Sequence, residues 1–273
     1  MIRFLRNERR YMLLAIGFFT RIPVPHFHDF HPDELNRSAK YFPLVGMFVG
    51  MIGAGAFVLA SKFLPNSIAL LISMAMTIYV TGAFHEDGLA DSADGLGGGW
   101  DKERILAIMQ DSRLGTYGAV ALFFMLFAKY QVLLALPAYF VPFILVTGHV
   151  FSRLCALLIM ADLNYVKHEG KAKPLATKIQ TGDLIFAVLL AAMPVPLFYF
   201  NFSPVALHMR DWLLLAGCCL TPMVLVWIWW RNKIKLWLGG YTGDCLGAMQ
   251  QMTELAFYLG LLVWAQQILS MPS

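Results

Sequence analysis

Residues 41–60 read YFPLVGMFVGMIGAGAFVLA and carry no charged side chain. A run of about 20 apolar residues is long enough for a helix to cross the hydrocarbon core of a bilayer. Gly46, Gly50 and Gly53 fall three or four residues apart, so they share one face of such a helix and let a neighbouring backbone approach closely. The stretch therefore predicts a membrane-spanning helix with a tightly packed face.

The composition extends this prediction to the whole chain. Its 273 residues are 59% hydrophobic and 14% charged, with a mean hydropathy of +0.63, whereas soluble domains are roughly 45–50% apolar and about 25% charged. We expect an all-α fold, a polytopic membrane helix bundle of about seven transmembrane helices that forms a single integral membrane domain, 1–273. A six-span arrangement stays open. The expected spans lie near residues 41–60, 66–84, 115–136, 138–160, 183–202, 212–230 and 246–269.

The N-terminus carries four arginines ahead of a short apolar run. The run from Tyr11 to Phe19 is too short to span a bilayer, and no small-residue cleavage site of a signal peptide follows it. We therefore expect an N-terminal helix that lies in the membrane interface. The four arginines are Arg3, Arg6, Arg9 and Arg10.

Seventeen of the 21 Lys and Arg residues fall on one side of a seven-span arrangement. They lie in the first forty residues and in the connections after the second, fourth and sixth spans. Because basic loops stay in the cytoplasm, the N-terminus is predicted inside and the C-terminus outside, in the bacterial inner membrane. The basic residues sit at span ends rather than on one stripe, which argues against nucleic-acid binding.

The cysteines favour neither a disulfide framework nor a zinc site. They form no CxxC pair and lie in or beside apolar segments, so we expect buried reduced thiols. The four are Cys155, Cys218, Cys219 and Cys245.

Acidic residues gather in one segment, where seven of the 17 fall between Glu86 and Asp111. Asp87, Asp91 and Asp94 are spaced i, i+4, i+7, which places three carboxylates on one face of a helix. Like charges this close repel one another unless a cation lies among them, and Mg²⁺ prefers carboxylate and phosphate oxygens. The spacing predicts a Mg²⁺ site, and a solvated acidic loop is the alternative.

Two polar groups flank this segment. His85 lies at the end of the second span and, with Asp87, is a candidate catalytic residue, although a histidine at a span end is often only interfacial. Downstream, a guanidinium and backbone N–H groups offer hydrogen bonds to phosphate oxygens. The candidate substrate-binding residues there are Asp111, Ser112, Arg113 and Gly115.

A second polar cluster precedes the last span. Three glycines before a helix start can form an anion-binding nest at the positive end of the helix. Asp244 is expected either to cap that helix or to add a metal ligand. The candidate substrate-binding residues are Gly239, Gly240, Thr242 and Gly243.

Three ionisable residues fall inside predicted spans. His149 and Arg153 are i, i+4 in the fourth span, and Glu254 lies in the last. Charged groups at this depth are costly and mark functional sites. We expect Arg153 to meet an acidic partner or a substrate phosphate.

Six segments match a known family in their order along the chain. They are residues 18–25 (FFTRIPVP), 41–46 (YFPLVG), 84–95 (FHEDGLADSADG), 111–116 (DSRLGT), 152–153 (SR) and 239–248 (GGYTGDCLGA). Together they resemble the adenosylcobinamide-GDP ribazoletransferase family, also called cobalamin (5′-phosphate) synthase, over almost the full length. Glu86 departs from the apolar residue usual there, and residues 97–99 are unusually glycine-rich.

The resemblance implies the final step of nucleotide-loop assembly in cobalamin biosynthesis, with Mg²⁺. Adenosylcobinamide-GDP and α-ribazole, or its 5′-phosphate, would give adenosylcobalamin, or its 5′-phosphate, and GMP. Carboxylates would hold the metal while arginine and glycine amides stabilise the spreading charge. The expected partners are these two substrates and the lipid bilayer, with other cobamide-assembly enzymes or a second copy of the chain left open.

Two other classes stay open. A CDP-alcohol phosphatidyltransferase would require arginine where this chain has Asp91. A transporter would suit His149, Arg153 and Glu254, but paired interrupted helices in two halves are expected of that class, and here the polar residues gather in loops.

Overall fold

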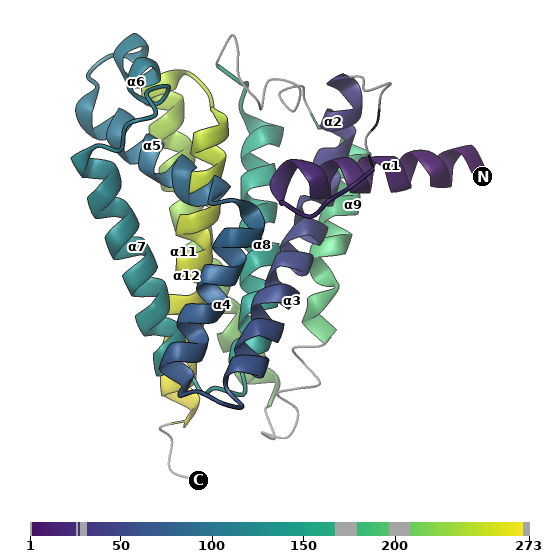
Figure 1. The fold of residues 1–273 in the computed structure, drawn as a ribbon, viewed down its shortest axis with the longest axis vertical. Helices are drawn as coiled ribbons and strands as arrows, with labels where there is room; N and C mark the ends of the chain where they lie inside the picture. Colours follow the sequence, from purple (N-terminus) through teal and green to yellow (C-terminus); the bar gives the residue numbers. More distant parts are fainter. Residues whose placement is uncertain (1, 26, 28–31, 167–178, 197–207, 270–273) are drawn as a thin grey trace.

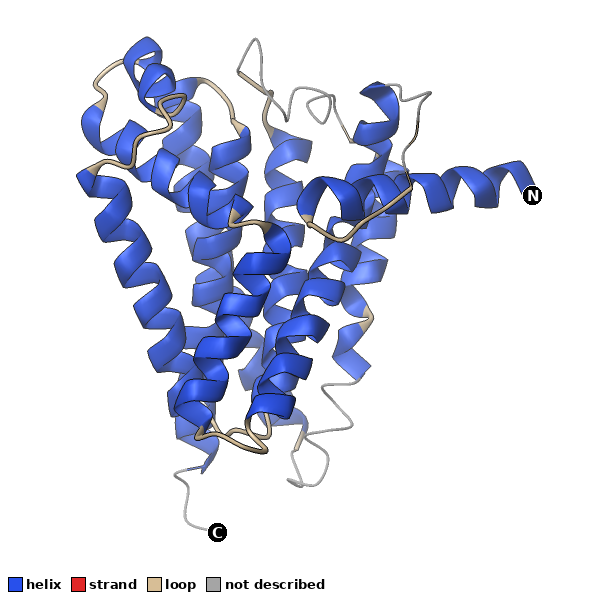
Figure 2. Ribbon diagram, in the orientation of Figure 1, coloured by secondary structure: helices blue, strands red, loops and turns tan. Residues whose placement is uncertain are grey.

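The computed structural model describes residues 2–25, 27, 32–166, 179–196 and 208–269. Helices follow one another along this part of the chain, and it contains no strand beyond an isolated bridge between Tyr165 and Tyr241 (Figure 2). The helices are α1 (Ile2–Phe19), α2 (Pro32–Ser38), the 3-10 turn η1 (Ala39–Tyr41), α3 (Phe42–Ala60), α4 (Asn66–Thr81), α5 (Phe84–Gly98), α6 (Lys102–Ile108), α7 (Thr116–Ala135), α8 (Val141–Asp162), α9 (Thr181–Ala192), α11 (Met209–Leu238) and α12 (Gly243–Leu269).

Most long helices run side by side as a bundle, while α5 and α6 cover one end and the last turns of α12 lie at the other (Figure 1). The apolar helices turn much of their surface outward. Only 22% of the apolar window of α7 and 17% of that of α11 are buried, and large side chains such as Phe123 and Leu225 are exposed. An outward apolar face is stable in lipid and not in water, so the predicted membrane helix bundle is confirmed.

The number of spans is less definite than expected. Within the described residues, four helices are long and apolar enough to cross a membrane, or five if the bent pair of α4 and α5 counts as one span. Helices do form at all seven predicted places, but α9 is short and α12 is not among those that qualify. Part of the fifth predicted span, residues 197–202, lies outside the described residues. The four qualifying segments are Glu34–Ala60, Thr116–Ala135, Val141–Asp162 and Met209–Leu238.

Glycines on α3 let two helices pack against it, as the sequence predicted. A Cβ on Gly46 would lie 2.3 Å from the carbonyl oxygen of His149, and one on Gly50 would lie 2.6 Å from Cα of Val146. Such distances leave no room for a side chain, so α3 and α8 touch backbone to backbone. Gly53 instead faces α4, where a Cβ would lie 2.6 Å from the methyl group of Thr77.

The N-terminal helix is longer than the apolar run predicted, because its arginines continue the same helix. In Figure 1 α1 lies across the bundle rather than along it. Ion pairs hold it there, since Lys40 contacts Glu8 at 2.9 Å and Asp183 of α9 at 3.1 Å. This placement agrees with the interfacial helix expected from the sequence.

A sharp break between α4 and α5 builds the end of the bundle where polar residues gather. The two helices meet at 85°, and the turn is made by Gly82 (φ 66°) and Ala83 (φ 59°). The backbone N–H of Arg21 donates to the carbonyl of Val80 at 2.7 Å and covers the break. A left-handed backbone conformation raises the free energy of a non-glycine residue by about 1–2 kcal/mol. Ala83 adopts it because the packing of the surrounding helices requires the turn.

Candidate active site

The two polar clusters predicted from the sequence meet where α5 crosses the start of α12. A Cβ on Gly88 would lie 2.9 Å from the carbonyl oxygen of Asp244 and 3.2 Å from Cα of Gly247. One on Gly247 would lie 3.1 Å from the carbonyl of His85. The helix backbones are therefore in contact, and the acidic and glycine-rich segments, about 150 residues apart in sequence, share one site.

Asp87 and Asp91 flank this crossing. Asp87 is exposed, Asp91 is half-buried, and Asp244 is half-buried at the beginning of α12. Thr242, rather than Asp244, is the N-cap, because its Oγ1 accepts from the N–H of Cys245 at 3.3 Å. Across the described residues, no three His, Cys, Asp or Glu side chains converge as a preformed metal site. The donor set that is present suits Mg²⁺, which commonly takes one or two carboxylates and completes its shell with substrate phosphates and water.

Asp94, expected at the same metal, has a different environment. It is buried, and its carboxylate accepts hydrogen bonds from the N–H groups of Gly115 at 2.8 Å and Gly118 at 2.9 Å. These amides belong to the first turn of α7, where the helix dipole favours a negative charge. The geometry therefore makes Asp94 an anchor between α5 and α7, which the i, i+4, i+7 spacing did not reveal.

The loop before α7 carries the predicted residues Asp111, Ser112 and Arg113. Arg113 forms an ion pair with Asp111, and its side chain is 87% exposed. The hydrogen bond from Arg113 lowers the pKa of Asp111 to about 2. The pair is thus charged throughout the physiological range, on a loop joined to α5 through Gly115 and Asp94.

At two of the predicted phosphate-binding glycines, the backbone geometry alone explains why the residue is glycine. Gly239 has φ 76° and ends α11 as its C-cap, a position that favours glycine. A Cβ on Gly240 would lie 2.1 Å from the carbonyl oxygen of Asn164, where Tyr241 N–H donates to the same carbonyl at 2.9 Å. Gly243 is the member of the set that lines the pocket described next.

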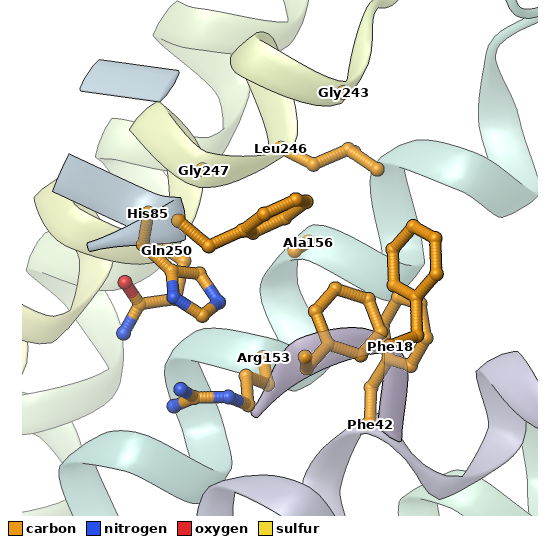
Figure 3. Close-up of a pocket in the computed structure, with 11 residues that line it drawn as sticks. Phe18, Phe42, His85, Arg153, Ala156, Gly243, Leu246, Gly247 and Gln250 are labelled. Carbon is orange, nitrogen blue, oxygen red and sulfur yellow. The ribbon is translucent and has the colours of Figure 1, made fainter. Parts of the chain in front are cut away.

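A pocket lies on the inner side of the α5–α12 crossing (Figure 3). The nitrogen atoms of His85, Arg153 and Gln250 lie on one side of it, and the rings of Phe18 and Phe42 lie on the other. The free space inside this pocket is about 20 Å³, and the empty space that includes the part open to solvent is about 430 Å³. We call it the phenylalanine pocket; it is lined by Phe18, Phe19, Phe42, Phe84, His85, Arg153, Ala156, Gly243, Leu246, Gly247 and Gln250.

Arg153 and His85 are both buried in this pocket. The Nη1 group of Arg153 lies 3.2 Å from Nδ1 of His149 and donates to the His149 carbonyl at 3.1 Å. Its Nε has no hydrogen-bond partner among the described residues, although the atom is buried. The His85 ring stacks on Phe19 at 6.2 Å between centroids. The structure therefore brings together His85, Arg153 and Gly243, and leaves Asp111 to Arg113 on a separate exposed loop.

Behind the pocket lies a polar network buried between helices. Glu254 receives a hydrogen bond from Tyr258 at 3.0 Å, forms an ion pair with Lys129 at 3.0 Å and lies 3.3 Å from His149. Gln250 donates both to Glu254 and to Ser152 of α8. These groups come from α7, α8 and α12, and Gln251 extends the network to Glu86 of α5 at 2.9 Å, so it fixes four helices around Arg153.

Several residues of this region were not predicted as site residues. Lys129 is only 5% exposed in the middle of an apolar helix, and a lysine at that depth is itself a functional signal. Gln250 and Gln251 interrupt the last apolar helix in the same way. Phe18, Phe42 and Phe84 lie in segments that match the family, but they come from three separate helices, and only packing shows that they share one pocket.

Comparison with known proteins gives one consistent result. The family model described as "Cobalamin-5-phosphate synthase" matches residues 11–262. A protein of Shewanella amazonensis named adenosylcobinamide-GDP ribazoletransferase is 43% identical over 272 residues, covering 96% of this chain and 98% of the relative. A relative of the same name in Ralstonia pickettii is 40% identical over 95% of this chain and 98% of the relative. Another, in Vibrio parahaemolyticus, is 38% identical over 97% of this chain and 96% of the relative. No solved structure matches the chain.

Proposed function

The chain belongs to the cobalamin-5-phosphate synthase family, and from that membership we propose how its site performs the family's reaction. It is a transferase that carries out the final step of nucleotide-loop assembly in cobalamin biosynthesis. In that step adenosylcobinamide-GDP and α-ribazole, or its 5′-phosphate, are joined and GMP is released. The observation that carries the site assignment is the backbone contact between Gly88 of α5 and Asp244 of α12.

The carboxylates beside this contact form the proposed Mg²⁺ site. Asp87, Asp91 and Asp244 offer hard oxygen ligands at the end of the bundle, where the charged pyrophosphate can stay solvated. When bound, the ion supplies neutralisation of the charge that develops on the phosphate oxygens. Asp94 is left out of this set because α7 amides already bind both of its oxygens.

His85 acts on the acceptor side. The acceptor hydroxyl attacks the phosphorus attached to the cobinamide arm, a new P–O bond forms, and the bond to GMP breaks with its electron pair leaving on GMP. The His85 imidazole accepts the proton of the hydroxyl as the bond forms. Its stacking on Phe19 keeps the ring in one orientation and excludes water that would otherwise compete as nucleophile.

The two other classes considered from the sequence lose their support. A family match over residues 11–262 and relatives that align over their full length place the chain outside the CDP-alcohol phosphatidyltransferases and the transporters. The buried pair of Lys129 and Glu254, which would suit an ion pathway, instead packs α7 against α12.

Release of GMP from adenosylcobinamide-GDP tests the metal assignment. We expect Asp87→Asn and Asp91→Asn to lower the rate at saturating substrate by at least about a hundredfold, because each removes a charge that ligates the metal during the transfer. Chelation of Mg²⁺ should stop the wild-type reaction, and restored Mg²⁺ should recover it. The readout is GMP release by protein purified in detergent or nanodiscs.

Glu103→Gln is the matched control, since Glu103 is an exposed acid on the neighbouring helix α6. It should keep the wild-type rate. Wild-type rates in both aspartate variants would contradict the proposed metal site and would favour the alternative, a solvated acidic loop.

A further inference from the structure

The phenylalanine pocket is deeper and less polar than the pyrophosphate of the activated substrate requires. Arg153 lies nine residues before the end of α8, which corresponds to roughly 14 Å along the helix. Moving a doubly charged pyrophosphate to that depth among phenyl rings is costly. The phosphates therefore belong at the carboxylates, and the pocket suits a less polar part of a substrate.

The shape and chemistry of the lining restrict what that part can be. Phe18, Phe42 and Phe84 present ring edges and faces of the kind that hold a flat aromatic group. Arg153 Nε is a buried donor with no hydrogen-bond partner in the part of the chain that the structure describes. A buried unpaired donor is stabilised by an acceptor, such as the nitrogen of a heteroaromatic ring. Gly243, which also lines the pocket, is next in sequence to Asp244, so the pocket lies close to the candidate carboxylates.

We propose that the phenylalanine pocket binds the planar heteroaromatic base of the ribazole acceptor, with a ring nitrogen accepting a hydrogen bond from Arg153 Nε. This proposal rests on the transferase function given above and names the subsite that selects the base. The base enters the pocket, the ribose stays at the mouth, and its hydroxyl faces His85 and the carboxylate end. The sequence alone suggested an acidic partner or a substrate phosphate for Arg153; its place in a pocket lined by phenyl rings points to the base instead.

The first test varies the substrate and leaves the protein unchanged. Wild-type protein is given α-ribazole or the same nucleoside with an indole-type base, in which C–H replaces the free ring nitrogen. Losing that acceptor leaves Arg153 Nε unpaired, so we expect KM for the indole nucleoside to be about tenfold to a hundredfold higher. Equal KM values for the two nucleosides would overturn the assignment of Arg153 Nε.

The second test varies the protein. Phe18→Ala opens the half-buried side of the pocket and should raise KM for α-ribazole about tenfold by removing an aromatic contact, while KM for adenosylcobinamide-GDP stays within about twofold. Phe123→Ala, at an exposed ring on α7 that is 62% accessible, is the matched control and should change neither value. Arg153→Met, which removes every donor at this position, should remove the discrimination against the indole nucleoside, as in a double-mutant cycle.

The outcomes separate this proposal from the function on which it rests. If Phe18→Ala raises the KM values of both substrates equally, the pocket does not select the base and the proposal fails, although GMP is still released. If wild-type protein releases no GMP with any acceptor, the transferase function itself fails.

Discussion

At the scale of single residues, Asp94 shows that neighbouring carboxylates of one helix can have unrelated roles. Asp87 is exposed and Asp91 is half-buried, whereas Asp94 is buried and binds the first turn of α7. A carboxylate that accepts two backbone N–H bonds at a helix N-terminus is stabilised both by the hydrogen bonds and by the dipole. The residue therefore belongs to the stability of the site rather than to its metal chemistry.

This difference predicts opposite effects for two similar substitutions. Asp94→Asn turns an amide NH₂ towards a backbone N–H and should lower stability by about 1–3 kcal/mol. Asp87→Asn removes an exposed charge from a crowded cluster and should keep or raise stability while it abolishes turnover. Thermal unfolding in detergent, followed with GMP release, separates the two. An Asp94→Asn protein with wild-type melting temperature and no activity would place Asp94 at the metal after all.

At the scale of elements, the crossing of α5 and α12 holds the two sequence clusters together. Gly88 and Gly247 face each other there; a Cβ on Gly88 would lie 2.9 Å from a backbone oxygen, and one on Gly247 would lie 3.1 Å from another, so both contacts are tight. The 85° break at Gly82 and Ala83 turns α5 across the end of the bundle so that this crossing can form. The distance between the carboxylates of α5 and Asp244 thus depends on the close approach of the two helices at Gly88 and Gly247.

Gly88→Ala tests this dependence. The new Cβ would lie 2.9 Å from a backbone oxygen that cannot rotate away, so the helices must separate and the rate should fall by about tenfold or more. Gly98→Ala is the control on the same helix, because its Cβ would lie 3.5 Å from the Cδ1 atom of Ile108, an ordinary contact. Both variants are assayed for GMP release and melting temperature. Similar rates in the two would show that the crossing does not position the site.

At the scale of the whole molecule, the described basic segments lie at one end of the bundle. The arginine-bearing helix α1, the α5–α6 region and the last turns of α11 all lie away from the C-terminal end in Figure 1. The candidate carboxylates share the basic end. An active site among basic segments is expected on the cytoplasmic side of an inner membrane, where the nucleotide substrate is made.

Reporter fusions test this topology. Fusions after Asp94, Lys173 and Lys235 should report the cytoplasm, and one after Ser273 should report the periplasm, because an odd number of spans places the two termini on opposite sides. Lys173 lies outside the described residues, so its fusion rests on the sequence alone. A periplasmic signal after Asp94 would contradict the orientation, and a cytoplasmic signal after Ser273 would favour the six-span arrangement.

The membrane class, the places of the long helices and the two polar clusters of the candidate site could be predicted from the amino-acid sequence. Each of these properties depends on one segment of the sequence alone. A run of twenty apolar residues prefers lipid whatever it packs against. Gly46 and Gly50 leave one helix face without side chains, whichever helix packs there. The sequence also indicated that Arg153 and Glu254 are functional, because charge inside an apolar run is costly in any fold.

Only the tertiary structure decided which partner each polar group receives. Asp94 binds amides that lie 21 and 24 residues further along the chain, Lys129 pairs with Glu254, and three phenylalanines from different helices enclose one pocket. Spacing within a helix tells which side chains share a face, but not what that face meets. That depends on how the helices cross, which is set by close packing over the whole bundle and cannot be read from any one segment.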